Sequence, residues 1–561
     1  MTSAPNDIIF TNKARCRDCY RCVRVCPVKA IRMHDGQAHV DTERCIACGT
    51  CVRECPQGAK SIRNDVQRAV RLLASGEPVA CSVAPSFAAA FEPWQQRRLP
   101  SALRQLGFSY VGETAIGAYH SAAATARAVA RDPNRRHVCT ACPAVVRYVE
   151  RYRPAQLSQL VPVVSPMMAH ARHVHEQRGE NWKVVFLGPC VAKKAEAERP
   201  ELAGAVDCVL TFEELQQWLE QEGIDLRTCE ESGFDEAPEG EARLFPLEGG
   251  CVRTAGWTTD VLDGHVLAVS GFNEVRDSLD SLTADAEPLI IEPLFCARGC
   301  IGGPAMPGEQ TSYHRRGEVL KYAEHCPGCP PDTSQTHVLA TRFTPSQADR
   351  EEITEEQIRH VLEKTGKASE EDQLNCGACG YPTCREKAIA VIRGLAEVDM
   401  CMPYVRRLAE QRVDRIIETS PNGIVILDDQ LRILSMNPAF RRMFMCSDAV
   451  CGRPVSYLLD PEPFERLAAD PGQLIESTVE YPNYHLTCHQ ILYALADEQQ
   501  YVGIFVNVTR AQTSERQLDE LRVQTVLQAR ELLDQQTTMA ETIAVCLGEN
   551  AARSEALLDK L

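Results

Sequence analysis

The stretch Cys16-Arg17-Asp18-Cys19-Tyr20-Arg21-Cys22-Val23-Arg24-Val25-Cys26-Pro27 decides the fold of the amino-terminal part of this chain. Its spacing returns in a second run of cysteines that also ends in proline, at Cys45, Cys48, Cys51 and Cys55. A cubane iron-sulfur cluster needs four thiolates from a compact loop; C-x2-C-x2-C supplies three, and the fourth crosses over from the other run. We therefore expect two 4Fe-4S clusters in a ferredoxin-like domain, one on Cys16, Cys19, Cys22 and Cys55, the other on Cys45, Cys48, Cys51 and Cys26. Paired zinc sites, the alternative, would need separated C-x2-C pairs.

Composition limits the classes of protein that fit. A chain of 561 residues predicts several domains, and an apolar share of 44% is ordinary for globular protein. The formal net charge of −17 argues against a nucleic-acid partner, because phosphate binding needs clustered Lys and Arg. The sequence shows no secretory leader before the first cysteine and no apolar run that could cross a bilayer, so its 27 cysteines predict metal ligation in a reducing cytoplasm.

Changes of pattern along the chain predict a multidomain protein of α/β and α+β class. The expected parts are 1–75 with the two cysteine runs, 76–345 with alternating strands and helices, 346–408 with a second small cysteine module, 409–510 with five strands, and 511–561 as a helix. Residues 61–75 are expected to be a helical connector. The last helix has an imperfect heptad, which fits a weak coiled coil or dimer helix, or a solvated helix packed on the preceding domain.

Three separated segments of the α/β part carry four more cysteines. They are Thr140-Ala141-Cys142-Pro143, Gly188-Pro189-Cys190-Val191-Ala192-Lys193-Lys194-Ala195-Glu196, and Glu292-Pro293-Leu294-Phe295-Cys296-Ala297-Arg298-Gly299-Cys300-Ile301-Gly302-Gly303. Four thiolates are enough for another cubane, and the glycines would let backbone approach a bulky inorganic group. By spacing alone this is only a candidate site.

These segments resemble the three signature stretches of iron-iron hydrogenases, over about residues 79–300. The resemblance implies that Cys142, Cys190, Cys296 and Cys300 hold a 4Fe-4S cluster, and that Cys300 bridges it to a two-iron unit with CO, cyanide and dithiolate ligands. It also implies that Lys193 contacts one cyanide, and that Pro85 and Ser86 lie near the second. An ammonium buried beside an anionic metal ligand is physically sensible, since either charge alone would be costly there.

Departures from the family pattern bear on activity. Ala141 stands where catalytic members of the family carry a proton-transferring cysteine, and a methyl group cannot exchange a proton. Gly188 and Leu294 replace methionines, and Met167 replaces a glutamine. The stretch 112–119 lacks the paired glutamates of an onward proton relay. Acid-base help of this kind typically supplies ~10²- to 10⁴-fold in rate, so the pattern predicts slow turnover.

The carboxyl-terminal half carries two further resemblances. Cys376, Cys379, Cys384 and Cys401-Met402-Pro403 resemble a small 4Fe-4S module, with a zinc site of four cysteines as the alternative. The pair Cys326 and Cys329 has two possible interpretations, an incidental loop or a redox-active dithiol. Residues 412–508 resemble a PAS domain, notably in 417–428 and 435–440. His485 and His489 are conceivable haem ligands, but a structural role is the better interpretation.

Together these features predict a sensory iron-iron hydrogenase that binds or slowly oxidises H2 and passes its redox state through 4Fe-4S clusters to the PAS domain. Expected partners are H2, redox proteins, a downstream kinase or phosphatase, and a second copy through the last helix. The rival hypotheses are a catalytic hydrogenase with another proton route and a non-catalytic iron-sulfur redox relay that lacks the two-iron unit.

Overall fold

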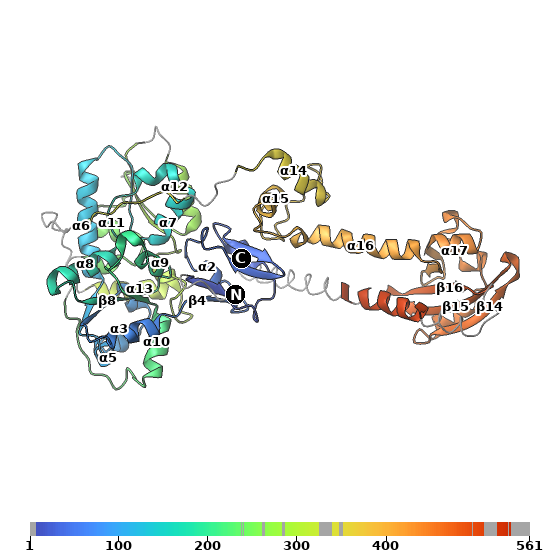
Figure 1. The fold of residues 1–561 in the computed structure, drawn as a ribbon, viewed down its shortest axis with the longest axis horizontal. Coiled ribbons are helices and arrows are strands. Elements are labelled where there is room, and N and C mark those ends of the chain that lie inside the picture. The colour runs from blue at the N-terminus through green and yellow to red at the C-terminus, as the bar shows by residue number, and fades with distance from the viewer. Residues whose placement is uncertain are drawn as a thin grey trace. The chain divides into compact units, whose positions relative to one another are not determined.

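The structure is a computed structural model that describes residues 7–236, 238, 241–260, 264–282, 287–324, 339–346, 352–495, 498–509, 524–536 and 538–539 (Figure 1). The pair Cys326 and Cys329 and most of the predicted last helix lie outside these residues. The chain divides into two compact units, Met1–Cys401 and Met402–Leu561. Among the described residues, no helix combines the length and the hydrophobicity needed to cross a membrane.

The two cysteine runs fold with short strands and helices. The elements are β1 (Ile9–Thr11), α1 (Arg21–Val25), β2 (Ile31–His34), β3 (Gln37–Val40), α2 (Thr50–Arg53) and β4 (Lys60–Ile62). β1 pairs with β4, and β2 pairs with β3, both antiparallel. The β2–β3 turn places Asp35 and Gly36 at positive φ, as a two-residue hairpin requires. The predicted helical connector is shorter than expected, because residues up to Ile62 belong to β4 and the helix α3 spans Val66–Leu73.

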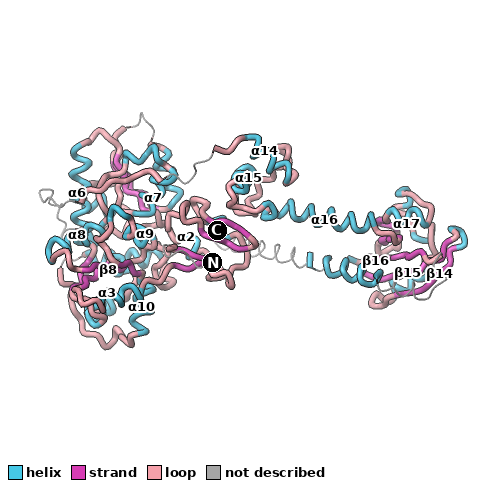
Figure 2. Tube along the Cα trace, in the orientation of Figure 1, coloured by secondary structure: helices cyan, strands magenta, loops and turns pink. Residues whose placement is uncertain are grey.

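Two parallel sheets form the centre of the first unit, and Figure 2 shows their strands among the surrounding helices. The larger has the order β6-β5-β8-β9, with β5 (Val79–Val83), β6 (Tyr110–Glu113), β8 (Lys183–Leu187) and β9 (Cys208–Leu210). The smaller has the order β10-β11-β7, with β10 (Val266–Ser270), β11 (Ile290–Leu294) and β7 (His137–Val138). All five residues of β5 are buried, as expected for a strand covered on both faces.

Helices supply the crossovers that parallel strands require. They are α4 (Pro93–Gln96), α5 (Leu99–Gln105), α6 (Ala115–Arg131), α7 (Pro143–Tyr152), α8 (Pro166–Arg178), α9 (Ala192–Ala197), α10 (Phe212–Gln221), α11 (Gly250–Thr254), α12 (Phe272–Asp280) and α13 (Ser312–Ala323). The small module adds α14 (Glu355–Lys364) and α15 (Cys384–Ile392). This module packs on the N-terminal domain, where Met33 N donates to Leu395 O at 3.0 Å.

The second unit is built on a five-stranded antiparallel sheet in the order β13-β12-β16-β15-β14. Its elements are α16 (Met402–Thr419), β12 (Gly423–Leu427), β13 (Ile433–Met436), α17 (Pro438–Met443), α18 (Glu462–Ala469), β14 (Ile475–Tyr481), β15 (Leu486–Leu495) and β16 (Gln500–Asn507). Phe440, Phe444 and Phe505 pack together in its core. All five predicted strands are present, with ends shifted by up to three residues.

His489 has a structural role in this sheet. Its ring nitrogens contact Glu476 Oε1 at 2.7 Å and Thr478 Oγ1 at 3.1 Å, so both are engaged. His485 is exposed in the turn before β15. The pair therefore gives no support to a haem site, as expected.

Candidate metal centres

The structure brings Cys16, Cys19, Cys22 and Cys55 together. The pKa of the Cys22 thiol is raised to about 11, chiefly by burial; Lys60 lowers it, and the neighbouring thiols of Cys19, Cys16 and Cys55 contribute to the rise. The backbone N–H of Ala59 donates to Cys55 Sγ at 3.3 Å. This is the first predicted ligand set, including the cysteine taken from the second run.

The second predicted set also converges. Burial raises the pKa of Cys51 well above its usual range, and the thiols of Cys48, Cys26 and Cys45 add to the shift. Backbone N–H groups already point at two of these sulfurs, since Ala30 N donates to Cys26 Sγ at 3.2 Å and Ala47 N to Cys45 Sγ at 3.3 Å. Buried thiols that resist ionisation alone become thiolates when a metal cluster supplies positive charge.

The four cysteines of the α/β core come from strand ends that are far apart in sequence. Cys190 follows β8, Cys296 follows β11, and Cys142 lies after β7 at the start of α7. Burial raises the pKa of Cys300, and the thiols of Cys190 and Cys142 raise it further. Burial likewise raises the pKa of Cys296, and the thiols of Cys190, Cys142 and Cys300 raise it further. Carboxyl ends of parallel strands thus assemble four thiols at one place, the position where open α/β sheets commonly bind ligands.

Lys193 lies beside these thiols. Its Nζ donates to Ser165 Oγ at 3.2 Å and to Glu196 Oε2 at 3.3 Å. Its positive charge lowers the pKa of Cys190 and Cys300, although burial raises both overall. Lys193 is therefore a half-buried, paired cation beside the four thiols.

Ser86 supplies an independent test of whether the site fits an anionic metal ligand. Pro85 and Ser86 open a buried 3-10 turn, Pro85–Ala89, directly after β5. The Ser86 side chain is 1% exposed, and its Oγ has no hydrogen-bond partner within the described part of the chain. An unpaired hydroxyl buried in this way is costly, and an acceptor such as a metal-bound cyanide would satisfy it.

The substituted positions lie within the same domain. Ala141 is half-buried and packs against a buried cluster that includes Cys139 and Cys251. Met167 and Leu294 are buried. Gly188 lies in a crowded place, because a Cβ there would be 2.7 Å from the ring of Phe186.

The glycines of the third signature segment lie where protein backbone is closely packed. A Cβ at Gly299 would lie 2.3 Å from Pro246 O, and one at Gly302 would lie 2.2 Å from Ala297 O. These glycines therefore let protein backbone pack against protein backbone around Cys300.

The small module gathers its cysteines in the same manner. Burial raises the pKa of Cys379, and the thiols of Cys401 and Cys376 raise it further, while Lys387 lowers it. Cys384 begins α15, and its N–H donates to Asn375 Oδ1 at 2.8 Å, which ties it to the loop of Cys376. Lys367 Nζ donates to Cys401 Sγ at 3.0 Å.

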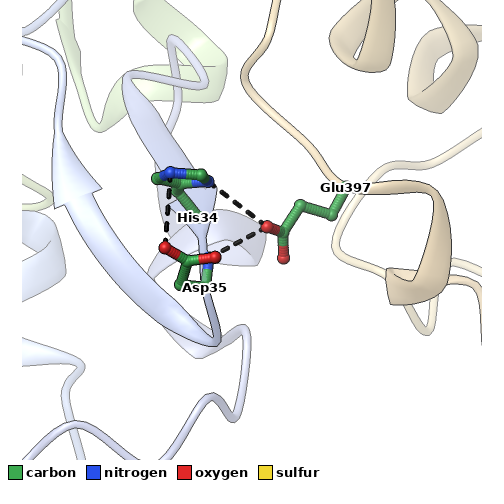
Figure 3. Close-up of side chains that lie close together, drawn as sticks. All are labelled: His34, Asp35 and Glu397. Atoms are coloured by element: carbon green, nitrogen blue, oxygen red, sulfur yellow. Dashed lines mark hydrogen bonds and ion pairs between the residues drawn. The ribbon is translucent and has the colours of Figure 1, made fainter.

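A polar contact joins this module to the N-terminal domain. Figure 3 shows His34 and Asp35 of the β2–β3 hairpin facing Glu397 of the module. The His34 Nδ1 to Glu397 Oε1 distance is 3.5 Å, and Asp35 N donates to the same oxygen at 2.9 Å. Their three ligand atoms lie within 4.8 Å of one another, but His34 and Asp35 are exposed, so we interpret the group as a docking contact.

Several residues near the centres were not predicted from the sequence. Arg151 Nη1 donates to Cys45 O at 2.7 Å, and Lys367 contacts Cys401. Lys194, the neighbour of Lys193, is fully buried between Asp65 and Glu214. Burial raises the pKa of Glu292 to about 7, although Cys251 N and Val252 N donate to it. All depend on contacts between distant segments, which no local spacing reports.

Comparison with known families agrees with this geometry. The description "Iron only hydrogenase large subunit, C-terminal domain" matches residues 77–304. The chain contains an iron-only hydrogenase domain. A 4Fe-4S dicluster domain matches residues 8–56, a putative Fe-S cluster domain matches 372–403, and a PAS domain matches 411–478. The hydrogenase domain is thus flanked by iron-sulfur domains and followed by PAS, as the sequence predicted.

Individual relatives of the hydrogenase domain fall into two groups. The NADP-reducing hydrogenase subunit HndD of Solidesulfovibrio fructosivorans is 27% identical over 367 residues, which cover 55% of this chain and 59% of HndD. The cytosolic Fe-S cluster assembly factor NAR1 of Vanderwaltozyma polyspora is 35% identical over 118 residues, covering 20% of this chain and 22% of NAR1. A variant of the FeFe-hydrogenase HydA1 from Chlamydomonas reinhardtii is 17% identical, with a TM-score of 0.42, and covers 51% of this chain and 100% of HydA1. The chain spans less than two thirds of the length of these two curated relatives.

Proposed function

We propose that this protein is a sensory iron-iron hydrogenase, which binds and slowly oxidises H2 and passes the resulting redox state through 4Fe-4S clusters to its PAS domain. One observation carries the proposal: the residues that would bind the metal centre are present, but the cysteine that would transfer protons is replaced by Ala141. Cys142, Cys190, Cys296 and Cys300 converge beside Lys193, and the turn that carries Ser86 contacts the turn that begins at Cys300. Ala141 precedes Cys142 directly in the sequence.

The residues present fit the metal centre of this family, a 4Fe-4S cluster joined to a two-iron unit. The four cysteines would hold its cubane, and Cys300 would also hold the two-iron unit, which supplies H2 binding and heterolysis when it is present. Lys193 Nζ would hold one cyanide by a charge-assisted hydrogen bond, and Ser86 Oγ, unpaired among the described residues, would donate to the other. Glu196 and Ser165 fix the Lys193 ammonium in place.

Ala141 is the reason for proposing a sensor. Fast turnover needs a group that takes a proton from the site and returns to its starting state, and an alanine side chain can do neither. H2 would therefore be turned over slowly.

The experiment is Ala141→Cys in the matured protein, assayed for H2 oxidation with an artificial electron acceptor. We expect the rate to rise by ~10²-fold or more, because a thiol restores proton transfer. Ala141→Ser is the matched control, since its hydroxyl is similar in size but a far weaker acid. A parent enzyme that is already fast, and that Ala141→Cys leaves unchanged, would favour the catalytic rival with another proton route.

The similarity to the NAR1 assembly factor supports a second candidate, a non-catalytic iron-sulfur protein that never receives the two-iron unit. Infrared spectroscopy after maturation separates the two, because metal-bound CO and cyanide give bands in a region free of protein absorption. Absence of these bands under conditions that mature a control hydrogenase would favour the second candidate.

Signalling requires that the two redox states differ in their free energy of contact with the PAS domain or its helices, since otherwise no population shifts. Under the proposal the output partner is a kinase or phosphatase, the reaction partners are H2 and redox proteins, and the last helix forms a homodimer in the cytoplasm. The domain limits 1–75, 76–345, 346–408, 409–510 and 511–561 are part of this proposal.

A further inference from the structure

Two buried lysines lie near the cysteines of the small module, and one of them donates to a cysteine sulfur. Lys367 and Lys387 are each 5% exposed. Lys367 Nζ donates to Cys401 Sγ at 3.0 Å, and Lys387 Nζ donates to Val398 O at 2.7 Å, three residues before Cys401. Burial lowers the pKa of Lys387, and the charges at Cys401 and Cys379 oppose that shift.

The sulfurs of the N-terminal domain have weaker donors. Cys26 and Cys55 accept from backbone N–H groups, and Cys48 is 3.4 Å from Thr50 Oγ1. Lys60, the cation beside Cys22, directs its ammonium to Thr11 and Ala38. A direct ammonium-to-sulfur hydrogen bond therefore distinguishes the module from these neighbouring sites.

The module is also fastened to the N-terminal domain beside Cys26. Lys29 Nζ donates to Val23 O at 3.0 Å and across the boundary to Gly380 O at 2.9 Å. Arg24 links the loops of two cysteine sites, because it donates to Cys19 O at 2.8 Å and to Ala378 O at 3.1 Å.

Tyr381 fills the space between the two sites. It is 3% exposed, Lys29 Nζ lies 5.7 Å from the centre of its ring, and the charges at Cys379 and Cys26 both raise its pKa beyond the effect of burial. Gly380 packs so closely on Val23 that an added Cβ would be 2.9 Å from it. The fit between the loops leaves little space between Cys26 and Cys379.

The reduction of a 4Fe-4S cluster adds one negative charge, and its potential depends on net charge and on hydrogen bonds to the sulfurs. A fixed ammonium in a low-dielectric site interacts strongly with that added charge. We propose that Lys367 makes the cluster of Cys376, Cys379, Cys384 and Cys401 the most easily reduced of the three outside the hydrogenase domain, so that this module is the electron acceptor of the chain.

This inference rests in part on the proposed function, which supplies the electrons. Oxidation of one H2 releases two protons, which pass to water, and two electrons, which pass to the N-terminal clusters. One of these electrons then moves on to the module, so that the donating N-terminal cluster is reoxidised, and the second electron stays on an N-terminal cluster. No bond to Lys367 forms or breaks. Cys401 is followed directly by Met402, the first residue of α16, so the reduced site would be joined by the chain to the helix that precedes the PAS sheet.

The test needs no H2 and no two-iron unit. The full chain is reconstituted with iron and sulfide, and its clusters are reduced with dithionite at controlled potentials while electron paramagnetic resonance records each signal. Cys376→Ala identifies the module signal by its loss. We expect that signal to appear first as the potential is lowered.

In Lys367→Gln, the ratio of reduced to oxidised module cluster at a given potential should fall at least tenfold, which is about 59 mV for one electron. Lys367→Arg, which keeps the charge, and Lys364→Gln, on the exposed end of α14, should stay within threefold of the parent. A module signal that appears last, or a Lys367→Gln ratio within threefold of the parent, would overturn the proposal. If Lys367→Gln fails to hold the cluster, the order of reduction in the parent protein decides, and a module signal that does not appear first overturns the proposal. Failure of H2 to reduce a protein that passes this test would count against the proposed function alone.

Discussion

The buried Lys194 gives a prediction whose size follows from its contacts. Its side chain has no exposed surface, and its three N–H groups donate to Asp65 Oδ2 at 2.7 Å, Val209 O at 2.9 Å and Glu214 Oε1 at 2.9 Å. Glu214 Oε1 also accepts from Asp65 N at 2.6 Å. Lys194 therefore holds α3, β9 and α10 together.

Lys194→Met fills a similar volume but leaves two carboxylates buried without their cation. Removing one partner of a buried ion pair costs roughly 3–5 kcal/mol, because the remaining charge is uncompensated. For a domain of this size, ~1 kcal/mol changes the melting temperature by roughly 2–4 °C, so we expect a decrease of at least about 6 °C. The assay is thermal unfolding of the reconstituted chain, followed by circular dichroism at one fixed scan rate.

Lys183→Met is the matched control, since Lys183 forms an exposed pair with Glu77 at 3.4 Å that should contribute about 1 kcal/mol or less. Adding Asp65→Asn to Lys194→Met should recover part of the loss, because one stranded charge is removed. A Lys194→Met protein that melts within 2 °C of the Lys183→Met control would refute the argument.

Three further predictions concern other parts of the molecule. Burial raises the pKa of Glu292 from 4.5 to about 7, so the folded state binds the Glu292 proton more tightly than the unfolded state does. The free energy of unfolding should therefore fall by about 3 kcal/mol as the pH rises from 4.5 to 7. Urea midpoints measured across that range should show this loss in the parent but not in Glu292→Gln. Gly302→Ala would place a Cβ 2.2 Å from Ala297 O and should lower the iron bound by the hydrogenase domain, whereas Gly317→Ala, with open space around it, should not. Asn437 makes four hydrogen bonds in the PAS core, including the one that caps α17. Asn437→Ala should therefore destabilise that domain by about 2 kcal/mol or more and increase its rate of cleavage by a protease. An unchanged cleavage rate would contradict this prediction.

The sequence predicted the parts of these sites that are encoded by short spacing. Two cysteine runs ending in proline gave the crossed pairing of Cys26 and Cys55, and the three signature segments gave four core thiols that the structure brings together. Buried apolar runs predicted β5 and β8 of the larger parallel sheet and all five strands of the antiparallel sheet, but not β6 or β9. Each of these signals is a short local stretch of sequence, so it can be recognised without the fold.

What the sequence did not predict depends on long-range packing. Lys194 received no prediction, yet it is fully buried and pairs with residues 129 and 20 positions away in sequence. Lys367 precedes Cys401 by 34 residues, and Gly302 owes its identity to a carbonyl that only the folded loop places against it. The helix expected from residue 61 was too long because pairing with β1 draws residues 60–62 into a strand.

The exchange of Cys26 and Cys55 between the two amino-terminal runs has a consequence for biogenesis. If two clusters bind as proposed, each run supplies one sulfur to its neighbour's cluster, so that loss of either cluster frees a cysteine in both runs. Assembly and oxidative damage should then be all-or-none for the pair: a protein isolated with one of the two inorganic groups missing should be a short-lived species, and repair must rebuild both together.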